Sequence, residues 1–289
     1  MTARRVRPPT GRRWSPSSRW GRPRQPIVPT PRPSPPTRSH GGDSVTVFAA
    51  HLRYRALEYL RTPIAIWPTV AFPLMIALFF IVPAAQDVPQ AATYGLVSIL
   101  LLSFTMIAMF TFGAGTAEER RLPWYDYQRT LPVRPTVVIA GRVAVGLVFA
   151  VIGALPAVVL ITARTAVEVP VARWPLLAVA VLAGALGMTL LGLGLGMALP
   201  FKAALPVANI AFFPMAFAGG LFLPLEQLPD WARIVGAATP MRPWVEVATA
   251  AAFGEGAPPG WWAALAAWIA ALGAFSVWAH RRDAVQRFR

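Results

Sequence analysis

The 289-residue sequence contains no cysteine, only three histidines and only 12 acidic residues. The absence of cysteine excludes a disulfide scaffold and a thiolate metal site. His40, His51 and His280 do not form a sequence cluster, which argues against a histidine metal site. The single lysine, Lys202, is not part of a G-x-x-x-x-G-K-S/T motif. We therefore expect this chain to have neither a bound metal nor a P-loop for ATP.

Charged side chains are scarce throughout the sequence. They make up 13% of the residues, against about a quarter in an ordinary soluble domain, and 56% of the residues are hydrophobic. A transmembrane helix needs about 20 mainly apolar residues. The sequence therefore predicts an all-α polytopic membrane protein with six transmembrane helices. These predicted spans occupy approximately residues 62–82, 91–117, 138–163, 175–199, 203–225 and 261–279.

The basic residues predict how the spans are oriented. With both termini on one side, 13 of the basic residues that follow residue 42 lie on that side and four lie on the other. Cytoplasmic loops carry the excess of arginine and lysine, so both termini are predicted to be cytoplasmic. The net charge of +15 is then a signal of orientation, and we expect no nucleic-acid partner.

The first 61 residues divide into two segments. Residues 1–42 contain ten arginines, ten prolines and no acidic residue, which predicts a disordered cytoplasmic tail. Adhesion to anionic lipid headgroups is its functional alternative, and a start codon assigned too far upstream would also account for such a segment. Residues 43–289 are predicted to form the membrane domain. Within it, Val45 to Arg61 has apolar residues at helical spacing, which predicts an amphipathic helix on the membrane surface or an extension of the first span.

The interiors of the spans hold almost no ionisable side chains, with Arg142 as the exception. Ion-coupled transporters and intramembrane enzymes carry such groups at membrane depth. Neither a pair of carboxylates nor a nucleophile with its base is recognisable in the sequence. We therefore expect that this chain is not an enzyme, binds no cofactor itself and takes the energy for any transport from elsewhere.

Small residues and prolines mark special positions in two spans. Gly192 and Gly196 form a small-xxx-small motif that predicts a close helix contact, with a contact between two copies as the narrower alternative. Pro206 and Pro214 in the fifth span predict a broken helix, either as fixed kinks or as part of a pathway that opens.

Two connecting segments are too polar or too long to be simple loops. Ala117 to Val137 combines charges with aromatic residues, which predicts a docking surface on the cytoplasmic face or an interfacial segment. Leu225 to Gly260 has apolar residues at helical spacing on either side of TPMRPW. It predicts one or two short helices that re-enter the outer leaflet between spans five and six.

These segments resemble the type-2 (ABC-2) permease subunits of ATP-binding cassette transporters, including multidrug and antibiotic exporters. The resemblance covers about residues 45–289 and rests on EERRLPWYDYQRTLPVRP, KAALPVANIAFFPMAFAGGLFLPLEQLP and ATPMRPW. The family architecture has an interface helix, six spans and a re-entrant pair between spans five and six. Many relatives have Gly-Thr shortly after the acidic residues, where this chain has Leu122-Pro123.

The resemblance implies a permease of the cell membrane that exports its substrate. Its partners would be a cytoplasmic ATPase subunit, which carries ATP and Mg²⁺, a second permease copy of the same or different sequence, and the lipid bilayer. The coupling loop that docks on the ATPase would include Glu118, Glu119, Arg120, Arg121, Arg129, Thr130, Leu131 and Pro132.

The substrate pathway is predicted from uncharged and aromatic residues in the spans. They favour an amphipathic cargo such as a drug or lipid-like molecule, although packing or lipid contact would also account for them. The residues assigned to this pathway are Phe104, Thr105, Asn209, Phe212 and Phe213. The alternative functions are an integral membrane enzyme and a scaffold that recruits partners through the tail. The preference for arginine over lysine is typical of GC-rich coding and predicts a bacterial, actinobacterial source.

Overall fold

The computed structural model describes residues 63–123, 125, 135–224 and 227–286, without the side chains of 63–69, 135–142, 145 and 284–286. The predicted tail (1–42) and the predicted amphipathic helix (45–61) lie outside these residues. Within the described residues every regular element is a helix, which confirms the predicted all-α class.

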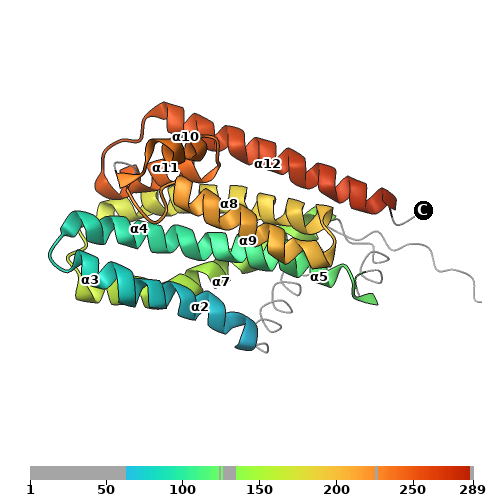
Figure 1. Ribbon diagram of the computed structural model, residues 1–289, viewed down its shortest axis with the longest axis horizontal. Helices are drawn as coiled ribbons and strands as arrows, with labels where there is room; N and C mark the ends of the chain where they lie inside the picture. Colours follow the sequence, from blue (N-terminus) through green and yellow to red (C-terminus); the bar gives the residue numbers. More distant parts are fainter. Residues whose placement is uncertain (1–62, 124, 126–134, 225–226, 287–289) are drawn as a thin grey trace, which may run out of the picture. The chain divides into compact units, whose positions relative to one another are not determined.

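The described helices follow one another along the chain in the order given below. Two long stretches each contain a π-helical part: α2 (Pro63–Ile76), η1 (Ala77–Ile81) and α3 (Val82–Ala85), then α4 (Pro89–Met106), η2 (Ile107–Gly115) and α5 (Thr116–Glu119). The remaining elements are α7 (Pro135–Arg164), the 3₁₀ turn η3 (Val171–Arg173), α8 (Trp174–Ala198), α9 (Phe201–Ala218), α10 (Asp230–Ala237), α11 (Met241–Phe253) and α12 (Pro259–Gln286). Figure 1 shows α5 and the C-terminal part of α12 at one end of the helix bundle, and α10 and α11 at the other.

By length and composition, five of the described helical stretches can cross a membrane. They are Pro89–Glu119, Gly146–Arg164, Val171–Ala198, Phe201–Ala218 and Pro259–Asp283, and they correspond to predicted spans two to six. The first predicted span falls on α2 to α3, where the apolar stretch identified, Val70–Ala85, is shorter. The count of six spans therefore stays a prediction.

Helix α9 differs from the predicted fifth span in two respects. It continues through Pro206 and Pro214, because a proline removes one backbone hydrogen bond and the remaining ones hold the helix. It ends at Ala218 and not near residue 225, because the chain turns at Gly220, whose φ of 84° favours glycine. The Tyr94 hydroxyl of α4 lies within hydrogen-bonding distance of the carbonyls of Gly220 and Leu223, shares its single O–H between them and fixes this turn.

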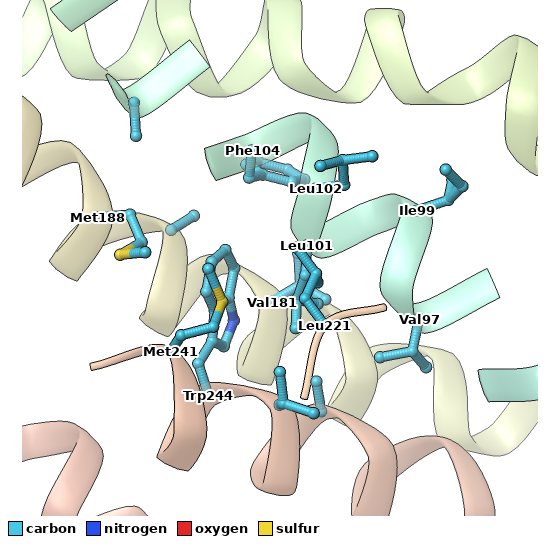
Figure 2. Packing of buried hydrophobic residues seen from close by; sticks show 14 of the residues in the cluster. Val97, Ile99, Leu101, Leu102, Phe104, Val181, Met188, Leu221, Met241 and Trp244 are labelled. Atoms are coloured by element: carbon cyan, nitrogen blue, oxygen red, sulfur yellow. The ribbon is translucent and has the colours of Figure 1, made fainter. Parts of the chain in front are cut away.

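The predicted short helices between spans five and six are α10 and α11. Helix α11 packs into the core, where Figure 2 shows Met241 and Trp244 pointing towards Val181 of α8 and Leu101 of α4. Trp244 is fully buried, and its indole N–H donates to the Ala180 carbonyl at 3.1 Å. The re-entry of these helices into a membrane is not shown and stays a prediction.

Helix α8 is held between η2 and α12 by glycines. A Cβ at Gly192 would overlap the Ala108 carbonyl, and one at Gly196 would lie too close to the Gly113 carbonyl of η2. A Cβ at Gly194 would overlap the Phe275 ring of α12. The predicted small-xxx-small contact is therefore present within the chain, where Gly192 and Gly196 let the backbones of α8 and η2 approach each other.

Candidate functional site

The most polar part of the predicted coupling loop begins where the long apolar stretch Pro89–Glu119 ends. After α5 the chain continues in a hydrogen-bonded turn, in which the backbone N–H of Arg120 donates to Thr116 and that of Arg121 donates to Glu118. This turn places four consecutive charged residues at the end of a helix that can cross a membrane. Their side chains have different surroundings.

Arg120 lies against the end of helix α8. Its guanidinium donates to the carbonyls of Gly196 at 2.8 Å and Leu199 at 3.1 Å. The last carbonyls of a helix lack partners within the helix and carry the negative end of its dipole. A guanidinium has several donors in a planar fork, so one side chain can satisfy two of these carbonyls.

Asp283 near the end of α12 completes this arrangement. The Arg120 guanidinium pairs with the Asp283 carboxylate, whose side chain is 2% exposed, while that of Arg120 is 15% exposed. A buried charge is costly unless it is paired and hydrogen-bonded, and here the pair and the two carbonyls meet both conditions. We refer to Arg120, Gly196, Leu199 and Asp283 as the Arg120 cluster. It joins the turn after α5 to α8 and α12.

The neighbours of Arg120 have more contact with solvent. Glu118 and Arg121 are exposed, and Glu119 is partly buried. The Arg121 guanidinium lies 4.4 Å from the ring centroid of Phe201, the first residue of α9, which is a cation–π arrangement. This part of the turn offers charges of both signs next to an aromatic ring. The other half of the predicted coupling set, Arg129, Thr130, Leu131 and Pro132, lies outside the described residues.

The residues predicted to line a substrate pathway fall into two groups. Phe104 and Thr105 are buried in the core, where the Thr105 hydroxyl donates to the Leu101 carbonyl of its own helix at 2.7 Å. On α9, Phe212 is fully buried and Phe213 is 51% exposed.

Aromatic contacts connect α9 to η2. The Phe212 ring makes edge-to-face contacts with Phe110 at 6.1 Å and with Phe213 at 5.0 Å between ring centroids. The Asn209 amide N–H donates to the Leu205 carbonyl of its own helix at 3.0 Å. Phe212 and Phe213 are therefore together, and Phe212 belongs to the same core as Phe104. The assignment of all five residues to a pathway stays a prediction.

A second arginine occupies a comparable position at the other end of α8. Arg173 directly precedes α8, and its guanidinium donates to the Phe253 carbonyl in the last turn of α11. Gly254 follows in the left-handed conformation with φ of 76° and ends α11. A Cβ at Gly254 would overlap the Arg173 guanidinium. We refer to Arg173, Phe253 and Gly254 as the Arg173 cluster.

An open cavity of about 550 Å³ lies next to the Arg173 cluster. It is bounded by the first turn of α4, by the connection between α7 and η3, and by Arg173 and Phe253. The backbone N–H of Glu168 in that connection donates to the Thr93 hydroxyl at 3.2 Å. Polar and apolar atoms both line the cavity.

Two of the three charged residues in these clusters were not found by sequence reasoning. Arg173 entered only as a charge that indicates orientation, and Asp283 was not singled out. Asp283 is the single acidic residue after Glu255 and follows two arginines, and this isolated acid in a basic helix end was the available signal. Its partner could not be predicted, because Arg120 is distant from it in the sequence.

Comparison with known protein families gives a match over most of the chain. The model of the family described as ABC-2 type transporter matches residues 46–253. The matched region includes Arg120, Arg173, Phe253 and all of α8, but not Asp283. A search of curated proteins found no match.

Proposed function

The chain belongs to the ABC-2 type transporter family of ATP-binding cassette permeases, and from this premise we propose that it is the membrane subunit of an exporter. Permeases of this family work in the bilayer with an ATPase subunit. The observation that carries the proposal is the charged turn at the end of Pro89–Glu119, inside the matched region. That turn offers a place where a helix that can cross a membrane meets a protein partner.

In this proposal the exposed side of the turn docks on the ATPase. Glu118, Arg121 and Phe201 supply charge of both signs and an aromatic ring. Complementary charges select a partner and fix its register, and aromatic and arginine side chains are enriched at interfaces. Glu119 and the undescribed residues Arg129, Thr130, Leu131 and Pro132 are assigned to the same surface. ATP and Mg²⁺ belong to the partner subunit.

The membrane parts of the proposal concern the spans and a second copy. We assign six spans, both termini in the cytoplasm and a re-entrant pair formed by α10 and α11 in the cell membrane. Large apolar side chains are exposed on η1 and α9, including Phe79, Phe80, Ile210 and Phe213. Exposed apolar surface of this kind faces lipid or another subunit, which is consistent with a permease dimer of identical or different chains.

The proposed cargo is an amphipathic drug or lipid-like molecule that moves outwards. The support for it is the uncharged and aromatic character of α9 around the buried Phe212 and the half-exposed Phe213. Binding sites for such molecules are mostly apolar and aromatic, with few polar groups. The direction of export is based on family analogy, and the bacterial, actinobacterial source in the same proposal is based on the preference for arginine over lysine.

Co-purification tests the docking surface. The chain is expressed with an ATP-binding cassette ATPase from the same organism as the proposed partner, and the complex is isolated through a tag on the permease. We expect the double charge reversal Glu118→Lys/Arg121→Glu to lower the recovered ATPase about tenfold, because close charge pairs contribute strongly to such interfaces. The matched control is Glu255→Lys, which reverses an exposed charge beyond α11 and should recover as much ATPase as the wild type. Equal recovery with all three chains would contradict the proposed surface.

A further inference from the structure

We propose that Arg120 is a positioning residue, which transmits displacement of the docking surface to α8 and α12. This inference rests on the proposed function, because it assumes that an ATPase acts on the turn after α5. It departs from the sequence-based assignment, in which Arg120 was one of the residues that contact the ATPase. Here Arg120 acts within the permease.

The contacts of Arg120 support an internal role. A docking residue must be accessible to its partner, whereas the Arg120 side chain is 15% exposed and its guanidinium contacts Gly196, Leu199 and Asp283. Its exposed neighbours Glu118 and Arg121 are one or two residues away. Docking and internal connection therefore fall on different residues of the turn. Glu118 and Arg121 are available to a partner, and Arg120 connects the same turn to α8 and α12.

The elements that Arg120 connects are already close to one another. Gly192 and Gly196 allow direct backbone contact between α8 and η2, and Gly194 allows Phe275 of α12 to pack against α8. Such contacts leave little free space in which a displacement could be absorbed. A force on Arg121 thus reaches α8 and α12 through one residue and its hydrogen bonds, without an intervening flexible segment.

Stability alone does not account for the ion pair. Replacing a buried ion pair by apolar residues of similar size is often neutral or stabilising, so packing does not require charged residues at these positions. The pair does supply directionality, because the planar guanidinium fixes the carbonyls of α8 and the carboxylate of α12 in one geometry. An apolar pair would fill the same space without linking the three elements by directional bonds.

The decisive variant removes both charges together. In Arg120→Met/Asp283→Leu neither partner is left as an unpaired buried charge, so the chain should fold and should retain its ATPase through Glu118 and Arg121. The chain has no cysteine, so Ala274→Cys, exposed on α12, gives a single site for an environment-sensitive bimane label. The complex with the ATPase is placed in proteoliposomes, and the change in bimane emission on ATP and vanadate is recorded.

We expect the double variant to keep ATPase recovery and thermal stability while the ATP-dependent change in emission falls about fivefold, as for the loss of a coupling interaction. Arg281→Met, which removes an exposed charge from the same helix end, should behave as the wild type. Asp283→Glu, which keeps the ion pair, should retain most of the signal.

Two outcomes would overturn the inference while the proposed function stands. A full emission change in the double variant would show that the pair has no role in transmission. Loss of ATPase recovery in a folded double variant would place Arg120 in the docking surface. A wild-type chain that neither retains the ATPase nor responds to ATP would instead contradict the proposed function, and this inference with it.

Discussion

Two arginines stand at opposite ends of α8, and each donates to the last carbonyls of a helix. Arg120 binds the end of α8 itself and pairs with buried Asp283, whereas Arg173 binds the end of α11 at the edge of an open cavity. A helix of the length of α8 separates them by about 37 Å. The same capping chemistry thus occurs once in a buried junction of three elements and once at a surface. We expect the first to matter for both stability and coupling, and the second for local stability alone.

The largest expected effect comes from the contact between Gly196, a member of the Arg120 cluster, and η2. Gly196→Leu places a side chain against the carbonyls of Phe112 and Gly113, which are backbone atoms that cannot move aside without shifting η2. Overpacking costs about 1–3 kcal/mol or more, and we expect this variant at the upper end or unfolded. Size-exclusion chromatography and thermal unfolding in detergent measure the effect. The matched control is Gly256→Leu, at a position with open space, and an equal loss there would contradict a steric cause.

The next largest effect is expected when one charge of the Arg120 cluster is removed and the other is left without its partner. Asp283→Leu alone leaves Arg120 without its carboxylate, and we expect a loss of about 2 kcal/mol, less than for a fully buried pair because Arg120 is 15% exposed. The double variant Arg120→Met/Asp283→Leu should recover stability to within about 1 kcal/mol of the wild type. Denaturation of the purified chains measures both values. If the double variant is less stable than the single one, the ion pair is not the reason for the loss.

A smaller effect is expected at the other end of α8. Arg173→Met removes the cation from the C-terminus of α11 and should lower stability by about 0.5–1 kcal/mol. It should leave ATPase recovery and ATP turnover unchanged, because the Arg173 cluster does not contact the turn after α5. Thermal unfolding and ATP turnover of the same preparation measure both. A loss of ATPase recovery or of ATP turnover in Arg173→Met would remove the distinction between the two ends.

Deletion of residues 1–42 is the change from which we expect no effect on either cluster. These residues lie outside the family match, which begins at residue 46. ATPase recovery and ATP turnover of the shortened chain should equal those of the full chain. A loss of both would favour the alternative in which the tail recruits partners, and a loss of membrane association alone would favour adhesion to lipid headgroups.

The sequence was sufficient for the class of fold and for five helices that are long and apolar enough to cross a membrane, because apolar runs of that length are rare in the helices of soluble proteins. It was insufficient at the end of α9, where Phe222 and Leu223 continue the apolar run although the chain has already turned at Gly220. Hydropathy depends on composition and does not detect a glycine in the left-handed backbone conformation.

Within the candidate site, the charge pattern singled out the segment but did not predict the different surroundings of its residues. Glu118, Glu119, Arg120 and Arg121 are equivalent as a run of charges. Only the fold shows that Arg120 is partly buried beside α8 while Arg121 contacts Phe201. Gly192 and Gly196 were recognisable as a close contact, but the partner, η2, was not. Contacts between residues distant in the sequence decide both cases, and no local pattern encodes them.

ATP turnover in proteoliposomes tests the central claim most directly. The ATPase proposed as the partner is assayed alone, with the wild-type permease, and with Glu118→Lys/Arg121→Glu or Glu255→Lys. We predict that the wild type and Glu255→Lys raise ATP turnover above that of the ATPase alone, and that the double charge reversal does not. A turnover that is the same with every permease, or without one, would contradict the assignment of this chain as the partner of an ATPase.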